Sequence, residues 1–226
     1  MESNVSAMIS KARPKITALL RSRKFYSQKE MINQYKTHIL CLLETNPGGF
    51  YHSLDSVLAP LDRLQTHFLN EMATSESDAF ILFNLLPLAA RRDIGMLGLI
   101  WKCIRGSAHS DLQQLFPRAR PVRHAYGTKL QNHRHSFQLE EERPGTHHAL
   151  LRRSIFGLAR IWNRLPREVI AAENVKNFQI SLTQMVRGGC SRKIEKWEHV
   201  FSPRPKLLRE TQFYEELYLY RISSSI

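Results

Sequence analysis

The stretch from Leu86 to Gly106, LPLAARRDIGMLGLIWKCIRG, constrains the fold more than any other part of the sequence. At 100° per residue its apolar side chains cover about half of the helix circumference. Pro87 suits a first helical turn, and Gly106 suits the position just after the last turn. A helix with so wide an apolar surface must be covered on several sides, so it is predicted to be a core helix. The side chains expected at the buried centre are Ile94, Leu97, Ile100, Trp101 and Ile104.

Asp93 stands apart in this helix because it falls inside the apolar arc, whereas Arg91, Arg92 and Lys102 form a basic stripe on the other side. A buried carboxylate without a partner is costly. We therefore expect Asp93 to be paired with an arginine from another segment or with a backbone amide. A catalytic acid is the alternative, but lone buried carboxylates are more often structural.

The segments before this helix show helical patterns joined by short turns. A short basic helix is expected at residues 15–24. Ser27 and Glu30 form a capping box that opens the next helix, and Ser75 can cap another. Pro60 is expected to begin a helix of its own. Residues 1–106 are therefore predicted to form one helical domain.

After Gly106 the chain becomes basic and irregular. Between Arg118 and Arg167 it holds ten arginines and one lysine against three glutamates, a balance of +8, and Pro and Gly interrupt it repeatedly. A short strand at 135–139, a helix at about 148–164 and an Asn174-capped helix ended by Gly188-Gly189 are expected. We predict a mainly α fold, an irregular helical cluster with a basic, loop-rich C-terminal half and at most minor β. Residues 107–189 form its basic, loop-rich and helical region, and 190–226 a C-terminal tail.

The net charge of the whole chain is +13, with a pI near 10.0. Such an excess favours polyanionic partners, most simply RNA or DNA bound without sequence preference. A basic structural piece of a larger assembly, meeting an acidic protein partner, is the alternative. The widely spaced Cys41, Cys103 and Cys190 predict reduced thiols inside the cell, in nucleus or cytoplasm. No apolar run approaches the roughly 18–20 residues of a membrane span, and no secretory signal core is present.

No cofactor, metal or catalytic site is predicted. His133, His135, His147 and His148 lack the accompanying cysteines, carboxylates or helical spacing of a zinc site. The serines lack a nucleophile elbow, and no paired aspartates or Gly-rich phosphate loop occur.

The nucleic-acid-binding residues are expected in the arginine-rich stretch, because phosphate contacts dominate binding of this kind. They are Arg118, Arg120, Arg123, Lys129, Arg134, Arg152, Arg153, Arg160 and Arg164. Trp162, between Arg160 and Arg164, has two interpretations. Its ring either stacks on a base or anchors a helix end in the core, and the core is favoured because large aromatic side chains are buried on average.

Short blocks between about Arg21 and Leu182 resemble, in order and rough spacing, the region after the palm in LINE-like non-LTR retrotransposon reverse transcriptases. The blocks are Leu61-Asp62, Gln65 and Phe68-Leu69; Leu88 with Arg91-Arg92-Asp93; Arg134-His135-Ser136; Arg153-Ser154-Ile155-Phe156; Trp162-Asn163, Leu165-Pro166 and Val169; and Asn177-Phe178 with Leu182. Together with Trp101, the residues Arg91, Arg92, Asp93, Trp162, Asn163, Leu165 and Pro166 are interpreted as structural motif positions.

The resemblance implies thumb-like and C-terminal helical parts that hold template and nascent strand. The aromatic-x-Asp-Asp palm motif of the RNA-directed DNA polymerase is missing, as are zinc-knuckle cysteines, and Gln179 stands where a lysine often follows the Phe. The expected protein is therefore a catalytically inactive reverse-transcriptase fragment that binds nucleic acid. A missing palm or another retroelement protein is a further expected partner, and a membrane is not. A protein-interaction module and a non-functional remnant remain the alternatives.

Overall fold

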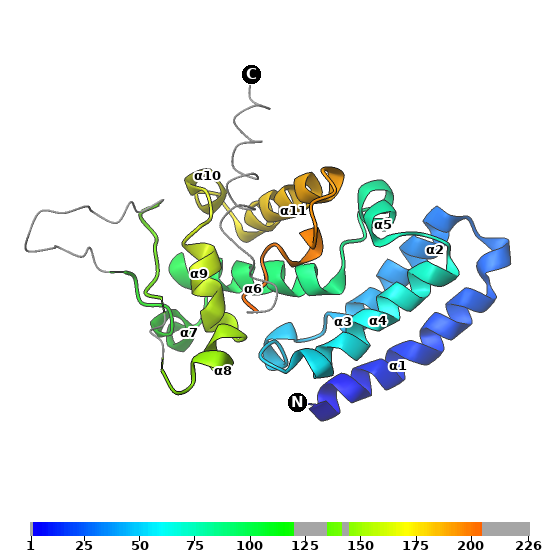
Figure 1. The fold of residues 1–226 in the computed structure, drawn as a ribbon, viewed down its shortest axis with the longest axis horizontal. Helices are drawn as coiled ribbons and strands as arrows, with labels where there is room; N and C mark the ends of the chain where they lie inside the picture. The colour runs from blue at the N-terminus through cyan, green and yellow to red at the C-terminus, as the bar shows by residue number, and fades with distance from the viewer. Residues whose placement is uncertain (1, 120–134, 142–144, 205–226) are drawn as a thin grey trace, which may run out of the picture.

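The computed structural model describes residues 2–119, 135–141 and 145–204, which fold almost entirely into helices joined by turns (Figure 1). The mainly α class is therefore confirmed. Within the described ranges, the strand expected at 135–139 is reduced to one isolated bridge between Arg118 and Leu139. The Asn163 side chain explains this, because it bonds both the N–H and the carbonyl of Leu139 and takes the place of a second strand. No described helix combines the length and the apolarity that a bilayer span requires.

The N-terminal half forms the right-hand part of Figure 1. Its helix α1 (Glu2–Arg21) packs along α4 (Asp55–Glu71) and also contacts α3 (Cys41–Leu43). The buried side chains of this half, such as Ile16, Tyr35 and Phe68, form an N-terminal core, in which the rings of Tyr35 and Phe68 stack with centroids 4.5 Å apart. The elements are α1 (Glu2–Arg21), α2 (Gln28–Tyr35), a π-helical turn (Lys36–Leu40), α3 (Cys41–Leu43), α4 (Asp55–Glu71) and α5 (Glu76–Phe83).

The C-terminal half is built around α6 (Leu88–Ile104), which runs across the left and centre of Figure 1. Helix α11 packs along α6, while α7 and α9 contact it nearer its C-terminal end. Gly98 allows the close approach of α11, because a Cβ atom there would overlap the side-chain amide of Gln179. The elements are α6 (Leu88–Ile104), α7 (Ser110–Gln114), α8 (His148–Arg152), α9 (Leu158–Trp162), α10 (Arg167–Ile170) and α11 (Val175–Ser191).

The predicted core helix is confirmed, with Pro87 as its N-cap residue and Gly106 at a φ of +73° just after its end. Ile94, Leu97, Ile100 and Trp101 are buried, whereas Ile104 is only partly buried. The side chains that cover the helix come mainly from the C-terminal half, including Trp162, Phe178 and Leu182. Residues 1–106 thus contain every member of the N-terminal core and also supply α6 to a second core.

Trp162 is fully buried in this second core, as the core interpretation predicted. Its ring lies 5.7 Å from that of Phe178 and meets the His135 ring edge-on at 6.1 Å. Its indole N–H donates to the Phe137 carbonyl at 2.8 Å, so the polar atom of the ring is satisfied. Trp162 is therefore not available for base stacking.

The predicted helix starts at Ser27, Ser75 and Asn174 are confirmed, since each of these side chains accepts a hydrogen bond from a first-turn N–H. The start at Pro60 is wrong. Helix α4 begins at Asp55, because the Leu54 carbonyl already accepts bonds from Val57 and Leu58, and it continues through Pro60 despite the missing donor.

Three other helix bounds also differ from expectation. The basic helix expected at 15–24 begins at Glu2, and the one expected at 148–164 is split by a 3-10 turn at Ile155–Gly157. The Ser154 hydroxyl causes this break by accepting the Phe156 N–H. Helix α11 passes through Gly188-Gly189, because burial of Gly189 and Cys190 outweighs the roughly 1 kcal/mol helix penalty of a glycine.

Candidate functional site

The structure places the nine predicted nucleic-acid-binding residues in different settings. Arg120, Arg123, Lys129 and Arg134 lie outside the described residues. Among the others, Arg118 and Arg160 are exposed, and Arg152 and Arg164 are half-buried. Arg153 is half-buried and donates to the carbonyl of His52 at 3.1 Å, so it fastens α8 to the N-terminal half. The predicted set is thus part surface and part structural.

Arg118 and Arg105 approach the ring of one partly buried phenylalanine. Their guanidinium carbons lie 5.2 and 5.1 Å from the centroid of Phe137. Arg105 also lies 5.5 Å from the Trp101 ring and donates to the Ile170 carbonyl at 3.1 Å. This geometry fixes both cations beside an aromatic ring. Sequence reasoning missed Arg105, whose only signal was its position in the last turn of the core helix.

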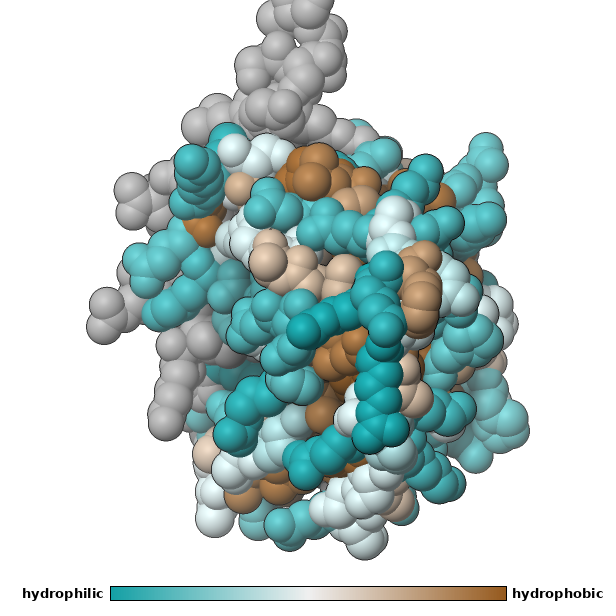
Figure 2. Space-filling model, turned by 90° about the vertical axis from the view of Figure 1, so that its right-hand side faces the viewer, coloured by the Kyte–Doolittle hydropathy of each residue, from teal (hydrophilic) through white to brown (hydrophobic). Residues whose placement is uncertain are grey.

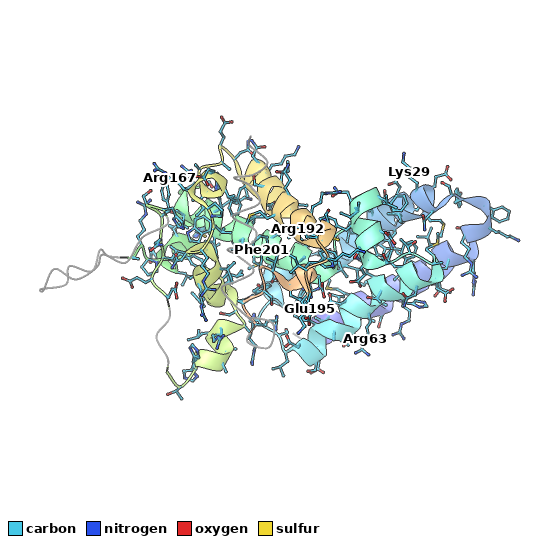
Figure 3. All side chains as sticks on the ribbon, turned by 45° about the horizontal axis from the view of Figure 1, so that its top comes forward. Lys29, Arg63, Arg167, Arg192, Glu195 and Phe201 are labelled. Atoms are coloured by element: carbon cyan, nitrogen blue, oxygen red, sulfur yellow. The ribbon has the colours of Figure 1, made fainter. Side chains whose placement is uncertain are left out.

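We call Lys102, Arg105, Arg118, Arg160 and Arg167 the basic end of the molecule. All five are exposed, and they belong to the C-terminal part of α6, to α9, to α10 and to the segment after α7. Figure 3 shows Arg167 at this end, far from Lys29 at the other. Exposed acidic residues also lie on or next to these segments: Asp111, Glu140, Glu141, Glu168 and Glu173.

A second basic surface lies at the turn between α1 and α2. Arg21, Arg23 and Lys24 are exposed there beside Phe25, which is 73% exposed. Arg23 is paired with Glu71 at 2.6 Å. Figure 2 looks onto this half of the molecule and shows hydrophilic residues with smaller hydrophobic patches between them.

The basic stripe expected on the core helix is largely neutralised, because two of its three members form ion pairs. Arg91 pairs with Glu44, and Arg92, only 7% exposed, makes a bidentate pair with Asp62 at 2.6 and 2.8 Å. Only Lys102 remains exposed. Two of the blocks singled out in the sequence, at Asp62 and at Arg91-Arg92-Asp93, therefore meet in the fold and act structurally.

Asp93 is buried and paired, as predicted, but its partner is a tyrosine rather than an arginine or a backbone amide. The Tyr51 hydroxyl donates to the Asp93 carboxylate at 2.6 Å. Burial raises the pKa of Asp93 to about 7, although the bond from Tyr51 and the nearby Arg92 and Arg204 oppose the shift. Desolvation also raises the pKa of Tyr51 well above its ordinary value, so the phenol stays a donor.

Arg204 is a structural residue that the sequence did not reveal. It is 8% exposed and donates to the carbonyls of Tyr51 and Ser53 at 2.7 and 3.0 Å, and to Asp55 at 2.6 Å. The preceding Trp197, Val200 and Phe201 are buried in the second core. The described part of the expected C-terminal tail is thus packed across the molecule and tied to the turn before α4.

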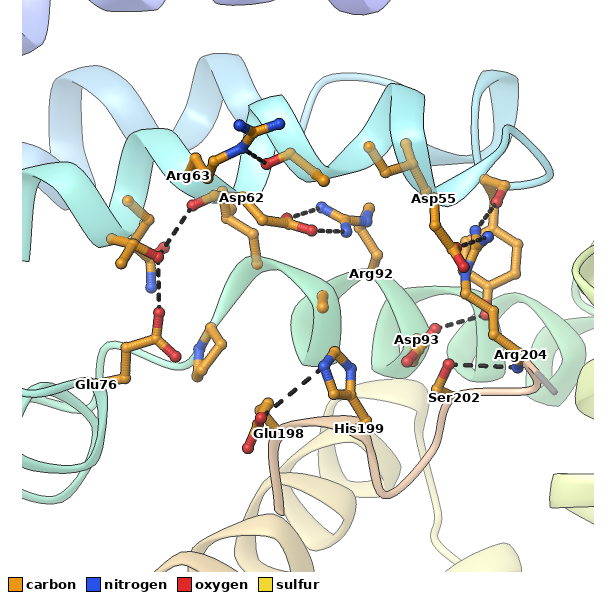
Figure 4. A pocket seen from close by; sticks show the side chains of 18 residues that line it. Asp55, Asp62, Arg63, Glu76, Arg92, Asp93, Glu198, His199, Ser202 and Arg204 are labelled. Carbon is orange, nitrogen blue, oxygen red and sulfur yellow. Dashed lines mark hydrogen bonds and ion pairs between the residues drawn. The ribbon is translucent and has the colours of Figure 1, made fainter. Parts of the chain in front are cut away.

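This strap, residues 197–204, closes one side of a cleft of about 490 Å³ whose other walls are α4, the start of α5 and the start of α6 (Figure 4). Five carboxylates line the cleft: Asp55, Asp62, Glu76, Asp93 and Glu198. Three guanidiniums also line it, those of Arg63, Arg92 and Arg204. Because carboxylates outnumber guanidiniums in the lining, the cleft is acidic, whereas the whole protein has a positive net charge.

Within the described part of the chain, no three His, Cys, Asp or Glu side chains are grouped so as to hold a metal ion. Comparisons of the chain with protein families, with curated proteins and with solved structures found no match.

Proposed function

We propose that this protein binds single-stranded or duplex nucleic acid without sequence preference, through its basic end. The observation that carries the proposal is the placement of Arg105 and Arg118 beside Phe137, with Lys102, Arg160 and Arg167 at the same end. A guanidinium has five N–H donors, so Arg105 can bond the Ile170 carbonyl with one of them and still offer others to phosphate oxygens while it lies beside the ring. The arginine-rich stretch that includes Arg118 and Arg160 supports the same polyanionic partner.

The resemblance to the post-palm region of LINE-like reverse transcriptases supports a holding role for this surface rather than a chemical one. We propose that the chain is a fragment of that kind, which contacts the sugar-phosphate backbone and leaves polymerisation to a palm supplied elsewhere. Backbone contacts of this type give affinity without sequence information. Trp162 contributes nothing directly, because it is buried.

The test is a titration of fluorescent single-stranded RNA, single-stranded DNA and duplex DNA at several salt concentrations. About five phosphate contacts on duplex DNA should give a slope of log K against log salt near −4 to −5, since each contributes about −0.9. Non-specific dissociation constants should be on the order of 10–100 μM at physiological salt.

A charge-matched pair of double variants locates the interface. Arg105→Gln with Arg118→Gln removes two charges at the basic end, and Arg21→Gln with Lys24→Gln removes two exposed charges at the opposite end. The first pair should flatten the salt slope by about 2, and the second should change it much less. Equal losses from both pairs would contradict the assigned surface. Absence of binding at 50 mM salt would favour an acidic protein partner instead.

A further inference from the structure

The cleft between the strap, α4, α5 and α6 has the dimensions of a small-molecule site, and one of its walls carries carboxylates that can accept hydrogen bonds. Ligand sites in proteins typically have volumes of about 300–1,000 Å³, and this cleft measures about 490 Å³. Two of its carboxylates are already occupied, because Asp62 binds Arg92 and Asp55 binds Arg204. Asp93 takes its hydrogen bond from Tyr51.

The two remaining carboxylates, Glu76 and Glu198, have no arginine or lysine partner among the described residues. Glu76 accepts a hydrogen bond from the Thr66 hydroxyl, at 2.8 Å. Glu198 lies 3.9 Å from the His199 ring, whose pKa burial holds below its ordinary value, so the ring is neutral at pH 7. Figure 4 shows both carboxylates on the side of the cleft opposite Asp62 and Arg63, with His199 next to Glu198. Among the described residues, neither of these two carboxylates is therefore paired with the side chain of an arginine or a lysine.

Gln65 provides an independent sign that a donor is missing. Its side chain is 2% exposed and lines the cleft, and its amide nitrogen donates to the Leu86 carbonyl at 3.2 Å. That bond fixes the orientation of the amide, so the other atom is the acceptor oxygen. This oxygen is buried and has no hydrogen-bond partner among the described residues. Buried acceptors are normally satisfied, so the unpaired oxygen at the wall of the cleft marks a place where an N–H donor is missing.

We propose that the cleft binds a small organic cation, an amidine, guanidine or amine with an apolar body. The N–H groups would donate to Glu76, Glu198 and the free oxygen of Gln65. The apolar body would lie on Leu58, Pro87 and Leu88, which also line the cleft. The site is separate from the basic end, so it does not depend on the proposed nucleic-acid function.

The experiment uses the full chain and two probes of nearly equal shape, the cation benzamidine and its neutral relative benzamide. Calorimetry and amide-detected NMR should show saturable benzamidine binding with a dissociation constant on the order of 1 mM, as expected for so small a ligand. The side-chain NH₂ signals of Gln65 should move. Benzamide should bind at least about tenfold more weakly, since each 1.4 kcal/mol of lost charge interaction is a factor of ten.

Glu76→Gln and Glu198→Gln keep the side-chain shape and should each weaken the binding of benzamidine about tenfold. Glu168→Gln on α10 is the control and should leave the affinity for benzamidine unchanged. Circular dichroism confirms that each variant is folded. Equal affinity for benzamide, equal loss in the control, or no saturable binding by the folded wild type would each overturn the proposal.

Discussion

Arg92 and Asp62, which lie thirty positions apart, face each other across α6 and α4 in a bidentate ion pair with N–O distances of 2.6 and 2.8 Å. The two partners differ in burial, because the Arg92 side chain is 7% exposed and the Asp62 side chain 35%. The pair therefore joins the N-terminal core to the core helix through one nearly buried cation.

Removing either partner of this pair should have unequal consequences. Arg92→Gln leaves Asp62 free to gain water, so the free energy of unfolding should fall by about 1–3 kcal/mol. Asp62→Asn leaves the buried guanidinium of Arg92 without its carboxylate partner, so the free energy of unfolding should fall by about 3–5 kcal/mol. Urea denaturation of both variants measures the difference. Arg23→Gln, which breaks the exposed pair with Glu71, is the control and should cost about 1 kcal/mol or less. Equal losses for the two core variants would contradict this account.

Asp93 should make stability depend on pH. The pKa of its carboxyl is about 7 in the folded protein against an ordinary value of 3.8, so between those values the folded state binds the extra proton. The contribution of this group to the free energy of unfolding is therefore largest below about pH 4. It decreases as the pH rises through the folded-state pKa of about 7. Asp93→Asn cannot ionise, so its stability relative to the wild type should rise from pH 5 to pH 8. Urea denaturation of both proteins across that range gives the difference, and a flat difference would show that Asp93 ionises freely.

Leu97→Ala should lower the free energy of unfolding by about 2–5 kcal/mol, because Leu97 is completely buried in the second core and its removal leaves a cavity. Leu82→Ala is the matched control, since that side chain is 67% exposed, and it should change stability by less than about 0.5 kcal/mol. Thermal or urea unfolding compares the two. Similar losses would mean that the core helix is not covered as described.

Substitution of alanine at two glycines should change the stability of the protein in opposite directions. At Gly157 a Cβ atom would overlap the backbone carbonyl of Arg152, which the turn between α8 and α9 holds in place. Gly157→Ala should therefore destabilise the protein by about 1–3 kcal/mol. At Gly95, inside α6, nothing lies within 4 Å of the added atom, so Gly95→Ala should stabilise the protein by about 0.5–1 kcal/mol. Melting temperatures of the two variants test this contrast, and a shift in the same direction would refute it.

The sequence predicted those features that depend on neighbouring residues. Ser27, Ser75 and Asn174 cap helices through bonds that span only three positions, so local pattern was sufficient. It also predicted that Asp93 needs a partner. It could not identify Tyr51 as that partner, because nothing local distinguishes a tyrosine 42 positions away.

The same limit applies to the candidate sites. The arginine-rich stretch pointed to Arg118 and Arg160 at the basic end, but Arg153 occurs in the same stretch and is committed to the His52 carbonyl. No local pattern in the sequence predicts the cleft. Its walls at Glu76 and Glu198 come together only because the strap crosses the molecule.

Because α6 packs against α11, the second core can be completed only late in translation. About 70 residues separate the end of α6 from the start of α11, and Phe201 follows later still. At roughly 5–20 residues per second, the apolar side of α6 stays uncovered on the ribosome for about 4–14 seconds. The N-terminal core has no such delay, since all its residues precede Ala89. Nascent chains stalled near residue 150 should therefore crosslink to chaperones through α6, and release from the chaperone should follow synthesis of α11 and the strap.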